Sequence, residues 1–232
     1  PHAHTSYVDG RDTVDEMAAA ALKKGFHSLG FSEHGEQPFD RAYGLTSEKR
    51  AAYRADVLRA REQYRGKLRI WLGVERDAHS TEERTDYDYA IGSCHYLPCG
   101  DGYVAVDGAP EGVDRLVRET FGGDGTAMAA AYFAQLGDYA VAYRPQIIGH
   151  FDLVRKRNGA GRYFDPRGPR YLAAAYAALE RAAESGAFLE VNTGAIARGV
   201  LSTPYPDEPL LRRWRALGGR AILSSDCHDA EK

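Results

Sequence analysis

Short apolar runs alternate with longer amphipathic stretches along most of the chain. The runs have the length and bounding residues of buried strands, whereas the longer stretches repeat their apolar positions with the period of a helix. After an opening strand at the N-terminus, the pattern predicts strands at 28–32, 69–75, 90–96, 147–152, 187–195 and 221–226. It predicts helices at 13–24, 47–64, 127–143, 169–185 and 208–217, with an irregular stretch at 100–124 that has room for a short strand and a helix.

The first predicted helix carries recognisable end signals. Asp12 is the expected N-cap, Glu16 lies in the first turn, and Gly25 follows the last turn. These signals place a helix directly between the opening strand and the strand at 28–32.

About seven strand–helix units follow one another without a linker-like tract. Strands separated by helices favour parallel pairing, and seven or eight such units commonly close into a (β/α) barrel. An open, doubly wound sheet is the alternative, although no GxGxxG follows the first strand. We expect a single domain over residues 1–232. We also expect trimming at both ends, because the chain starts directly before one candidate motif and stops directly after another.

Histidines gather at the ends of the predicted strands. Six of the eight lie at or just after a strand's C-terminal end: His2, His4, His34, His95, His150 and His228. In a (β/α) barrel these ends surround one mouth, so six imidazoles from distant parts of the chain would converge there. The HxH pair alone is also compatible with a chance match or a tag remnant; the joint placement argues against chance.

Acidic residues share this placement. Glu75 ends the strand at 69–75, Asp226 lies two residues before His228, and Asp9 follows the HxH pair. Imidazoles and carboxylates together bind zinc, iron or manganese, and this set exceeds the four ligands of one tetrahedral ion. More than one divalent ion is therefore expected, an arrangement that activates water for attack at phosphorus.

The motifs HAHT, SEHG, GVE, GSCH, GHFD and SDCH occur in this order over the whole chain. Together they resemble the successive motifs of the PHP (polymerase and histidinol phosphatase) family. Through GFSEHGEQPF, LGVE, GHFDLVRK and LEVNTGAIARG the chain is most similar to the stand-alone histidinol-phosphatases of that family. The resemblance implies an α/β fold, a distorted seven-stranded TIM-like (β/α) barrel of the PHP type, with a trinuclear metal site.

The resemblance also implies a distribution of ligands. His2, His4, Glu75 and Asp226 would hold the first ion; Glu75, as a bridge, His95 and His150 the second; and His34 and His228 the third. Many relatives carry a further histidine six residues beyond the second histidine of HxH, where this chain has Gly10. A two-metal enzyme therefore stays open, unless Asp9 reaches the third ion.

Phosphate needs cationic partners besides the metals. Arg198 is the first candidate, because a guanidinium donates two parallel hydrogen bonds to an oxyanion, and the resemblance points to the same residue. Lys156 is the second, with Arg155 and Arg157 beside it, although a solvated basic cluster explains these three equally simply. Asn192 could bind substrate or cap a turn. Among the acids near His34, namely Glu33, Glu36 and Asp40, we expect Glu36 to contact substrate.

Composition narrows the classes of partner that we expect this chain to bind. A net charge of −3 provides no basic field for nucleic acid, and no apolar stretch reaches the length of a membrane span. Three cysteines without CxxC spacing argue against a disulfide framework and favour a reducing cytoplasm. The expected partner is a small phosphate ester; the oligomeric state stays open.

The expected activity is metal-dependent hydrolysis of a phosphate monoester, with L-histidinol phosphate as the substrate that the resemblance implies. Asp226 or His228 would protonate the leaving alkoxide, and Arg198 would stabilise charge on the phosphoryl group. A PHP-type phosphodiesterase or nuclease is the enzymatic alternative. A metal-binding PHP module without turnover is the alternative from another class.

Overall fold

The computed structural model describes residues 1–231 and divides into two compact units. Unit 1 comprises Pro1–Ile91 together with the residues from Ser224 onward, and unit 2 comprises Gly92–Leu223. The expectation of one domain over the whole chain stays a prediction.

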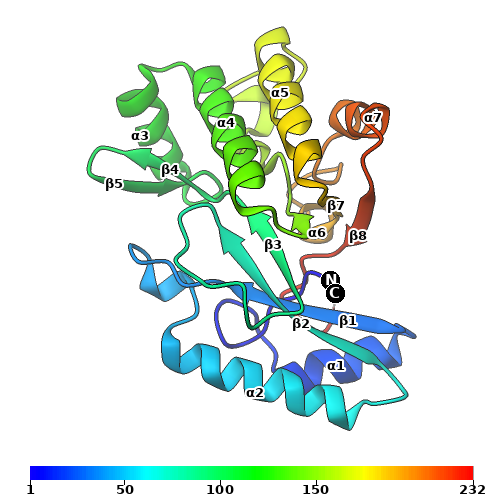
Figure 1. Cartoon of the computed structure of the whole chain (residues 1–232). Helices are drawn as coiled ribbons and strands as arrows, with labels where there is room; N and C mark the ends of the chain where they lie inside the picture. Colours follow the sequence, from blue (N-terminus) through cyan, green and yellow to red (C-terminus); the bar gives the residue numbers. More distant parts are fainter. Residues whose placement is uncertain (232) are drawn as a thin grey trace. The chain divides into compact units, whose positions relative to one another are not determined.

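Unit 1 is a layer of two helices against a pair of parallel strands (Figure 1). Its elements are α1 (Val14–Lys23), β1 (Ser28–His34), a 3-10 turn (Arg41–Tyr43), α2 (Ser47–Gln63) and β2 (Arg69–Asp77). Phe31, Tyr53, Val57 and Leu72 from the strands and α2 are buried in one core with the apolar face of α1. Burial of this shared face explains why the helices lie side by side along the strands.

Helix α1 begins one residue later than the end signals predicted. Thr13 is the N-cap: its hydroxyl accepts from the Glu16 amide, while the Glu16 carboxylate accepts from the Thr13 amide at 2.8 Å. The prediction of Asp12 as N-cap is therefore wrong, because the reciprocal capping box satisfies two helix-end donors. Gly25 follows the helix with φ +80°, as expected.

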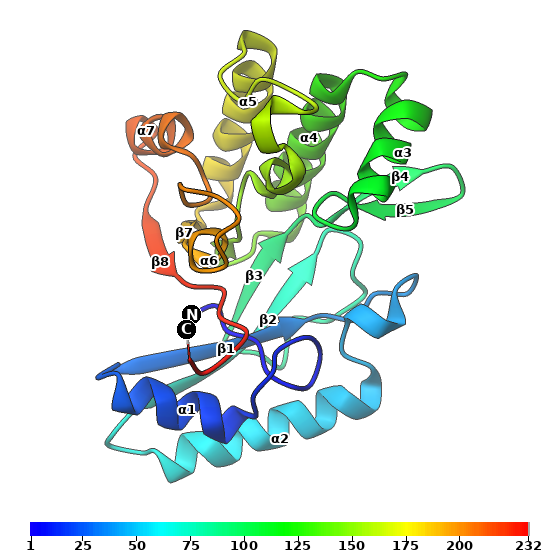
Figure 2. The same ribbon diagram turned by 180° about the vertical axis from the view of Figure 1, so that it is seen from behind.

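The N-terminal segment does not form the predicted opening strand. Ala3 makes an isolated parallel bridge to Cys227, and its carbonyl accepts from the Ser32 amide at 2.9 Å. The N-terminal segment and the segment around Cys227 consequently lie next to each other (Figures 1 and 2).

The remaining strands and helices follow in chain order. They are β3 (Tyr89–Ser93), which crosses from unit 1 into unit 2, β4 (Tyr96–Cys99), β5 (Gly102–Ala105), α3 (Pro110–Phe121), α4 (Gly125–Tyr143), β6 (Ile147–Ile148), α5 (Pro169–Ser185), β7 (Phe188–Asn192), α6 (Gly194–Ala197), α7 (Glu208–Ala216) and β8 (Ala221–Ser224), with 3-10 turns at Leu153–Arg157 and Gly159–Gly161. The predicted strand 90–96 is thus two strands, of which β4 pairs antiparallel with β5. The expectation of a strand and a helix within 100–124 is confirmed by β5 and α3.

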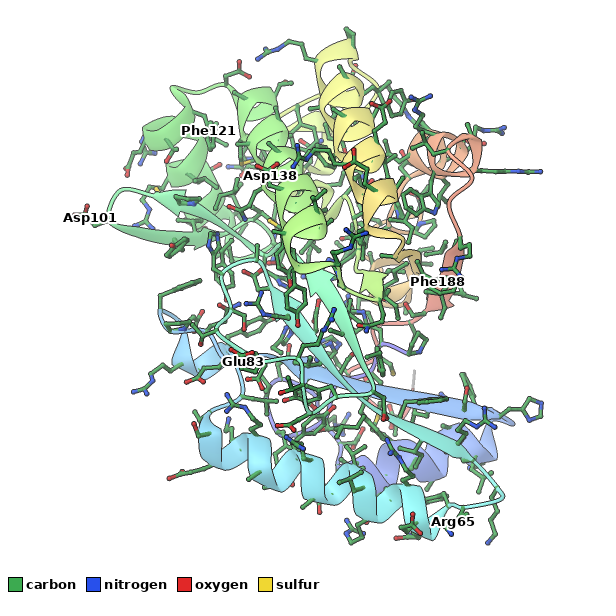
Figure 3. All side chains as sticks on the ribbon, viewed as in Figure 1. Arg65, Glu83, Asp101, Phe121, Asp138 and Phe188 are labelled. Atoms are coloured by element: carbon green, nitrogen blue, oxygen red, sulfur yellow. The ribbon has the colours of Figure 1, made fainter. Side chains whose placement is uncertain are left out.

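Helices α4 and α5 pack closely in unit 2. A Cβ on Gly137 would lie 3.3 Å from the Ala178 backbone, so the small residue permits the approach. Asp138 of α4 pairs with Arg181 of α5 at 2.9 Å. The Arg220 guanidinium lies 4.2 Å from the ring centroid of Phe188 at the start of β7; Asp138 and Phe188 are labelled in Figure 3.

Six strands form the main sheet of the described residues, in the order β1-β2-β3-β6-β7-β8. The α/β class and parallel pairing of β1 with β2 and β6 with β7 are as expected. The count of seven is wrong, because the N-terminal segment contributes only a bridge. The barrel form of the sheet stays a prediction. No helix within residues 1–231 combines the length and apolar character needed to cross a bilayer.

Candidate metal centre

Four segments of unit 1 bring candidate ligands together. The register that pairs His34 with Glu75 places both residues at the C-terminal ends of β1 and β2. The Ala3–Cys227 bridge aligns the HAHT segment with the C-terminal segment. His2 and His4 flank the bridge on one segment, and Asp226 and His228 flank it on the other. The bridge therefore brings the HxH and DxH pairs next to each other.

The first group of ligands is buried and closely spaced. The Nε2 atoms of His2 and His4 lie 3.3 and 3.5 Å from Glu75 Oε2, and 3.6 and 3.3 Å from Asp226 Oδ1. Ligands about 2.0–2.1 Å from a tetrahedral ion are roughly 3.3–3.4 Å apart, so these separations fit an ion between the four side chains. Asp226 has φ +51°, a backbone conformation that is uncommon for a residue with a side chain.

A second group surrounds Asp9. Its carboxylate oxygens lie 3.1 Å from His228 Nε2, 3.6 Å from His34 Nε2 and 3.5 Å from His4 Nδ1. One atom from each of these four residues lies within 4.8 Å of all the others. The sequence left a ligand to a further ion missing at Gly10. Asp9 lies among the three imidazoles that would bind this ion.

Gly10, the position at which many relatives carry a histidine, cannot take a side chain in this conformation. A Cβ there would lie 2.6 Å from the Thr5 amide nitrogen and 2.7 Å from the His4 carbonyl carbon. Both neighbours are backbone atoms that cannot move aside, so Asp9 is the available donor of this loop.

The donor set fits divalent cations. Both ring nitrogens of His4 are buried and make no hydrogen bond within residues 1–231. Burial, with the neighbouring His34, lowers the pKa of His4 to about 4, so the imidazole is neutral near pH 7, the form that binds metal. Burial opposes ionisation of Asp226, but His2 and His4 outweigh it and hold its pKa well below the usual range.

Glu33 lies next to His4 and holds the residue that follows it. It is fully buried, and one of its oxygens accepts from the Thr5 amide at 2.6 Å and the Thr5 hydroxyl at 2.5 Å. Its other oxygen lies 3.9 Å from His4 Nδ1. Burial raises the pKa of Glu33 to about 7, against the effect of the Thr5 bonds. Glu33 thus anchors the residue after His4, instead of standing as a solvated acid beside His34.

Unit 2 contains the other two predicted histidine ligands. The rings of His95 and His150 lie 4.8 Å apart, and the His150 amide donates to Glu190 at 2.7 Å. Asn192 donates to the same carboxylate oxygen and accepts from the Gly194 amide, both at 2.9 Å. Asn192 therefore caps the turn into α6, one of its two expected roles. The bridging role of Glu75 to these histidines stays a prediction.

The predicted phosphate-binding cations differ in their surroundings. Arg155 is buried: it pairs with Asp152 at 2.6 Å and donates to the carbonyl of Pro204 at 2.7 Å. Lys156 pairs with Asp107 at 2.7 Å, whereas Arg198 is exposed at the C-terminal end of α6. Phosphate binding by these cations stays a prediction.

Glu36, the acid expected to contact substrate, lies in unit 1, where it pairs with Arg50 at 2.8 Å. Two acids of unit 2, the half-buried Asp107 and the buried Glu190, were missed from the sequence. Burial opposes ionisation of Asp107, but Lys156, His95 and His150 hold its pKa below its usual value. Asp107 lies in the irregular stretch after β5, where no motif marks it. Glu190 lies inside an apolar strand in LEVNTG, and a carboxylate at such a position was the available signal.

Known proteins share both sequence and fold with this chain. The sequence profile of the PHP domain matches residues 1–194. A probable histidinol-phosphatase of Deinococcus radiodurans is 31% identical over 98% of this chain and 85% of its own length. The histidinol-phosphatase of Bacillus subtilis is 27% identical over 99% of this chain and 92% of its own length.

Solved structures share the fold. A candidate histidinol phosphatase of Listeria monocytogenes superposes with a TM-score of 0.85 at 17% identity, covering 99% of this chain and 95% of its own. The histidinol phosphate phosphatase of Lactococcus lactis, complexed with zinc, L-histidinol and phosphate, gives a TM-score of 0.67 at 18% identity, over 100% of this chain and 86% of its own. With the motif order and the family profile in agreement, the chain belongs to the PHP domain family.

Proposed function

We propose that this chain is a metal-dependent phosphomonoesterase that hydrolyses L-histidinol phosphate, with water, to L-histidinol and inorganic phosphate. Two curated relatives that match nearly the whole chain carry this activity in their names, one of them as probable. A protein of the same fold binds zinc, L-histidinol and phosphate together. The reaction belongs to histidine biosynthesis, for which a cytoplasmic location is expected.

The observation that carries the proposal is the first ligand group. Two imidazoles and two carboxylates face one another at 3.3–3.6 Å, all buried, with both nitrogens of His4 making no hydrogen bond within the described residues. Such a cluster costs free energy unless a cation completes it. A structural core has no use for this arrangement, whereas metal-assisted hydrolysis requires it.

We assign zinc, iron or manganese to two or three sites. His2, His4, Glu75 and Asp226 would hold the first ion, and Asp9 with His34 and His228 a further one. His95 and His150 are the remaining ligands of this proposal. Bound divalent ions would supply an acidified water and Lewis-acid stabilisation of phosphoryl oxygens.

The chain's own residues would bind and orient the ester. The exposed Arg198 would donate to phosphate oxygens, and Lys156, whose partner Asp107 lies beside the two histidines of unit 2, is the second cation. Glu36 offers a carboxylate to the cationic part of the substrate. Asp226 or His228 would return a proton to the leaving alkoxide, so that L-histidinol departs neutral at its oxygen.

Steady-state kinetics on the zinc-loaded chain test the proposal. Phosphate release from L-histidinol phosphate is compared with release from other monoesters and with cleavage of bis-nitrophenyl phosphate. We expect a preference for L-histidinol phosphate of at least ~100-fold in kcat/KM, roughly 2.7 kcal/mol of transition-state binding. The variant His4→Ala is the matched control and should be inactive.

Two outcomes would overturn the assignment. Faster cleavage of the diester than of any monoester would favour the phosphodiesterase alternative. Stoichiometric zinc without turnover on any ester would favour a binding module.

A further inference from the structure

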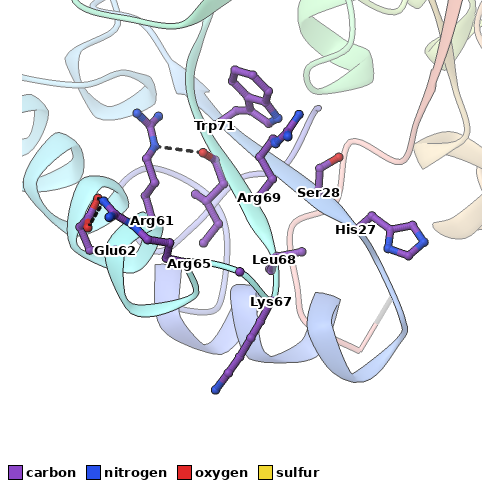
Figure 4. A pocket seen from close by; sticks show the side chains of 11 residues that line it. His27, Ser28, Arg61, Glu62, Arg65, Lys67, Leu68, Arg69 and Trp71 are labelled. Carbon is purple, nitrogen blue, oxygen red and sulfur yellow. Dashed lines mark hydrogen bonds and ion pairs between the residues drawn. The ribbon is translucent and has the colours of Figure 1, made fainter.

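A hollow in unit 1 lies at the opposite end of β1 and β2 from the candidate metal centre. We name it the basic hollow; the residues that matter to it are His27, Arg61, Arg65, Lys67, Arg69 and Trp71 (Figure 4). Ser28 pairs with Arg69 at this end of the strands, and His34 with Glu75 at the other. Six residues of extended chain span about 20 Å, so the two sites are separate.

The basic hollow carries uncompensated positive charge. Arg65 pairs with Glu62 at 2.7 Å, and Arg61 is held by the Ile70 carbonyl at 3.0 Å and by Asp88. Lys67, Arg69 and His27 form no ion pair with any residue in the part of the chain that the structure describes. Glu62 is the acid that lines the hollow. An anion is therefore the ligand that this lining attracts.

Trp71 adds an aromatic surface. It alternates with the buried Ile70 along β2, so Arg69 and Trp71 project to the same, exposed side of the strand (Figure 4). The indole is 41% exposed, and the Arg69 guanidinium lies 5.8 Å from its ring centroid. A lone exposed tryptophan needs no explanation. An indole with a guanidinium beside it in a hollow, however, offers a planar ring both a stacking surface and a cation.

The volume of the basic hollow is consistent with binding of a small molecule. The hollow has a volume of about 910 Å³, near the upper end of the range for small-ligand sites, about 300–1,000 Å³. Inorganic phosphate would use the cations but leave the indole unused.

We propose that the basic hollow binds a nucleoside phosphate, whose base stacks on Trp71 and whose phosphates contact Arg69. Lys67 points toward the other end of the hollow and adds to its positive potential (Figure 4). The ligand class follows from the combination of a stacking surface with an unpaired guanidinium in a basic hollow. Neither the metal centre nor the phosphatase reaction is needed for this binding.

Titration of the zinc-loaded chain with ADP tests the proposal. The chain has two tryptophans, and the other, Trp214, is 2% exposed, so a saturable change in fluorescence reports on Trp71. Calorimetry measures the same binding without the indole signal. Adenosine and inorganic pyrophosphate are titrated separately to test the stacking contact and the phosphate contacts alone. Each should bind more weakly than ADP. Trp71→Ala should weaken ADP binding by about 10-fold, within the range for loss of one base-stacking contact.

Charge reversal provides the matched comparison. Lys67→Glu with Arg69→Glu should weaken ADP binding by at least ~10-fold, because the phosphate-binding Arg69 is lost and the potential of the hollow changes sign at two positions. Lys49→Glu with Arg118→Glu makes the same charge change at exposed positions outside the hollow and should change the affinity by less than about 2-fold. Both double variants should keep wild-type phosphatase activity, which also shows that they are folded.

His4→Ala separates the hollow from the metal centre, and it should retain ADP binding. Three results would overturn the proposal: no saturable ADP binding at millimolar concentration, binding lost in His4→Ala but kept after charge reversal in the hollow, or pyrophosphate that binds as tightly as ADP without changing the fluorescence of Trp71.

Discussion

Two buried clusters of charged side chains differ in how their charges are balanced. In unit 2, Arg155 lies between Asp152, the hydroxyl of Thr203 and the carbonyl of Pro204, with contacts of 2.6–3.2 Å. In unit 1, the nitrogens of His2 and His4 face the carboxylate oxygens of Glu75 and Asp226 at 3.3–3.6 Å. In the first cluster a guanidinium balances a carboxylate, although Asp152 Oδ1 and Arg155 Nε make no hydrogen bond within residues 1–231; the second cluster has the spacing of ligands around an ion.

This difference distinguishes the unit 2 cluster, which stabilises the fold, from the unit 1 cluster, which could bind a ligand. The buried Arg155 holds two segments together, the turn at Leu153–Arg157 and the loop at 203–207. Two buried carboxylates that face two imidazoles are costly unless a cation lies between them. The unit 1 cluster is therefore the candidate metal centre.

Replacing Glu75, the buried carboxylate expected to serve two ions, should have the largest effect. Glu75 Oε2 lies within 3.5 Å of nitrogens of His2, His4 and His34. Glu75→Gln loses the anionic oxygen, so we expect kcat/KM for L-histidinol phosphate to fall by at least ~10³-fold, roughly 4 kcal/mol. Steady-state kinetics with zinc analysis measures this. The exposed Glu62→Gln is the control; near-native turnover in Glu75→Gln would refute the ligand assignment.

Removal of metal should destabilise the protein through the same cluster. An ion present at about 1,000 times its dissociation constant stabilises the folded state by about 4 kcal/mol. EDTA should therefore lower the Tm of the zinc-loaded chain, as calorimetry would record. His4→Ala should show a clearly smaller drop, and an equal drop in both would place the stabilising ion elsewhere.

Breaking the ion-paired cluster of unit 2 should affect stability instead of turnover. Arg155→Ala leaves Asp152 buried and unpaired, at a cost of about 3 kcal/mol in the free energy of unfolding. Urea denaturation measures the loss, and Arg155→Lys should recover part of it. Arg212→Ala, which removes an exposed ion pair with Glu208, should change stability little. A stable Arg155→Ala with a raised KM would instead support direct phosphate binding by Arg155.

The smallest effect is expected at Arg198. This side chain is exposed, so Arg198→Gln should leave stability unchanged while it raises KM for L-histidinol phosphate by about 10-fold, the value of one charge-assisted contact. The inhibition constant of inorganic phosphate should rise in parallel. Arg162→Gln, at another exposed arginine of unit 2, serves as the control. An unchanged phosphate inhibition constant would remove Arg198 from the site.

Local signals were sufficient for several helices. The helix predicted at 169–185 is α5 with the same bounds, because Pro169 stands at its first position and Gly186, with φ +75°, ends it. The interruption between β3 and β4 could not be predicted, since residues 90–96 read as one apolar run and the antiparallel partner β5 lies in an irregular stretch.

The candidate ligands of unit 1 were predictable for a different reason. His34 and Glu75 end apolar runs, and parallel strands bring such ends to one edge, so convergence follows from the strand pattern alone. No comparable rule indicates the environment of a basic residue. Arg155 and Arg198 each follow a strand and look equivalent in the sequence, yet one is buried in ion pairs and the other is exposed.

By itself, the order of motifs along the chain determined the α/β class, the family and the imidazoles and carboxylates that would meet, because these depend on local periodicity and on which residues end each strand. Only the tertiary structure decided that Asp9 lies among three imidazoles, that Arg155 is buried in ion pairs and that Trp71 lies beside the unpaired Arg69. The burial and the ion pairing of a side chain depend on its neighbours in space. Those neighbours come from distant parts of the sequence, so local patterns do not reveal them.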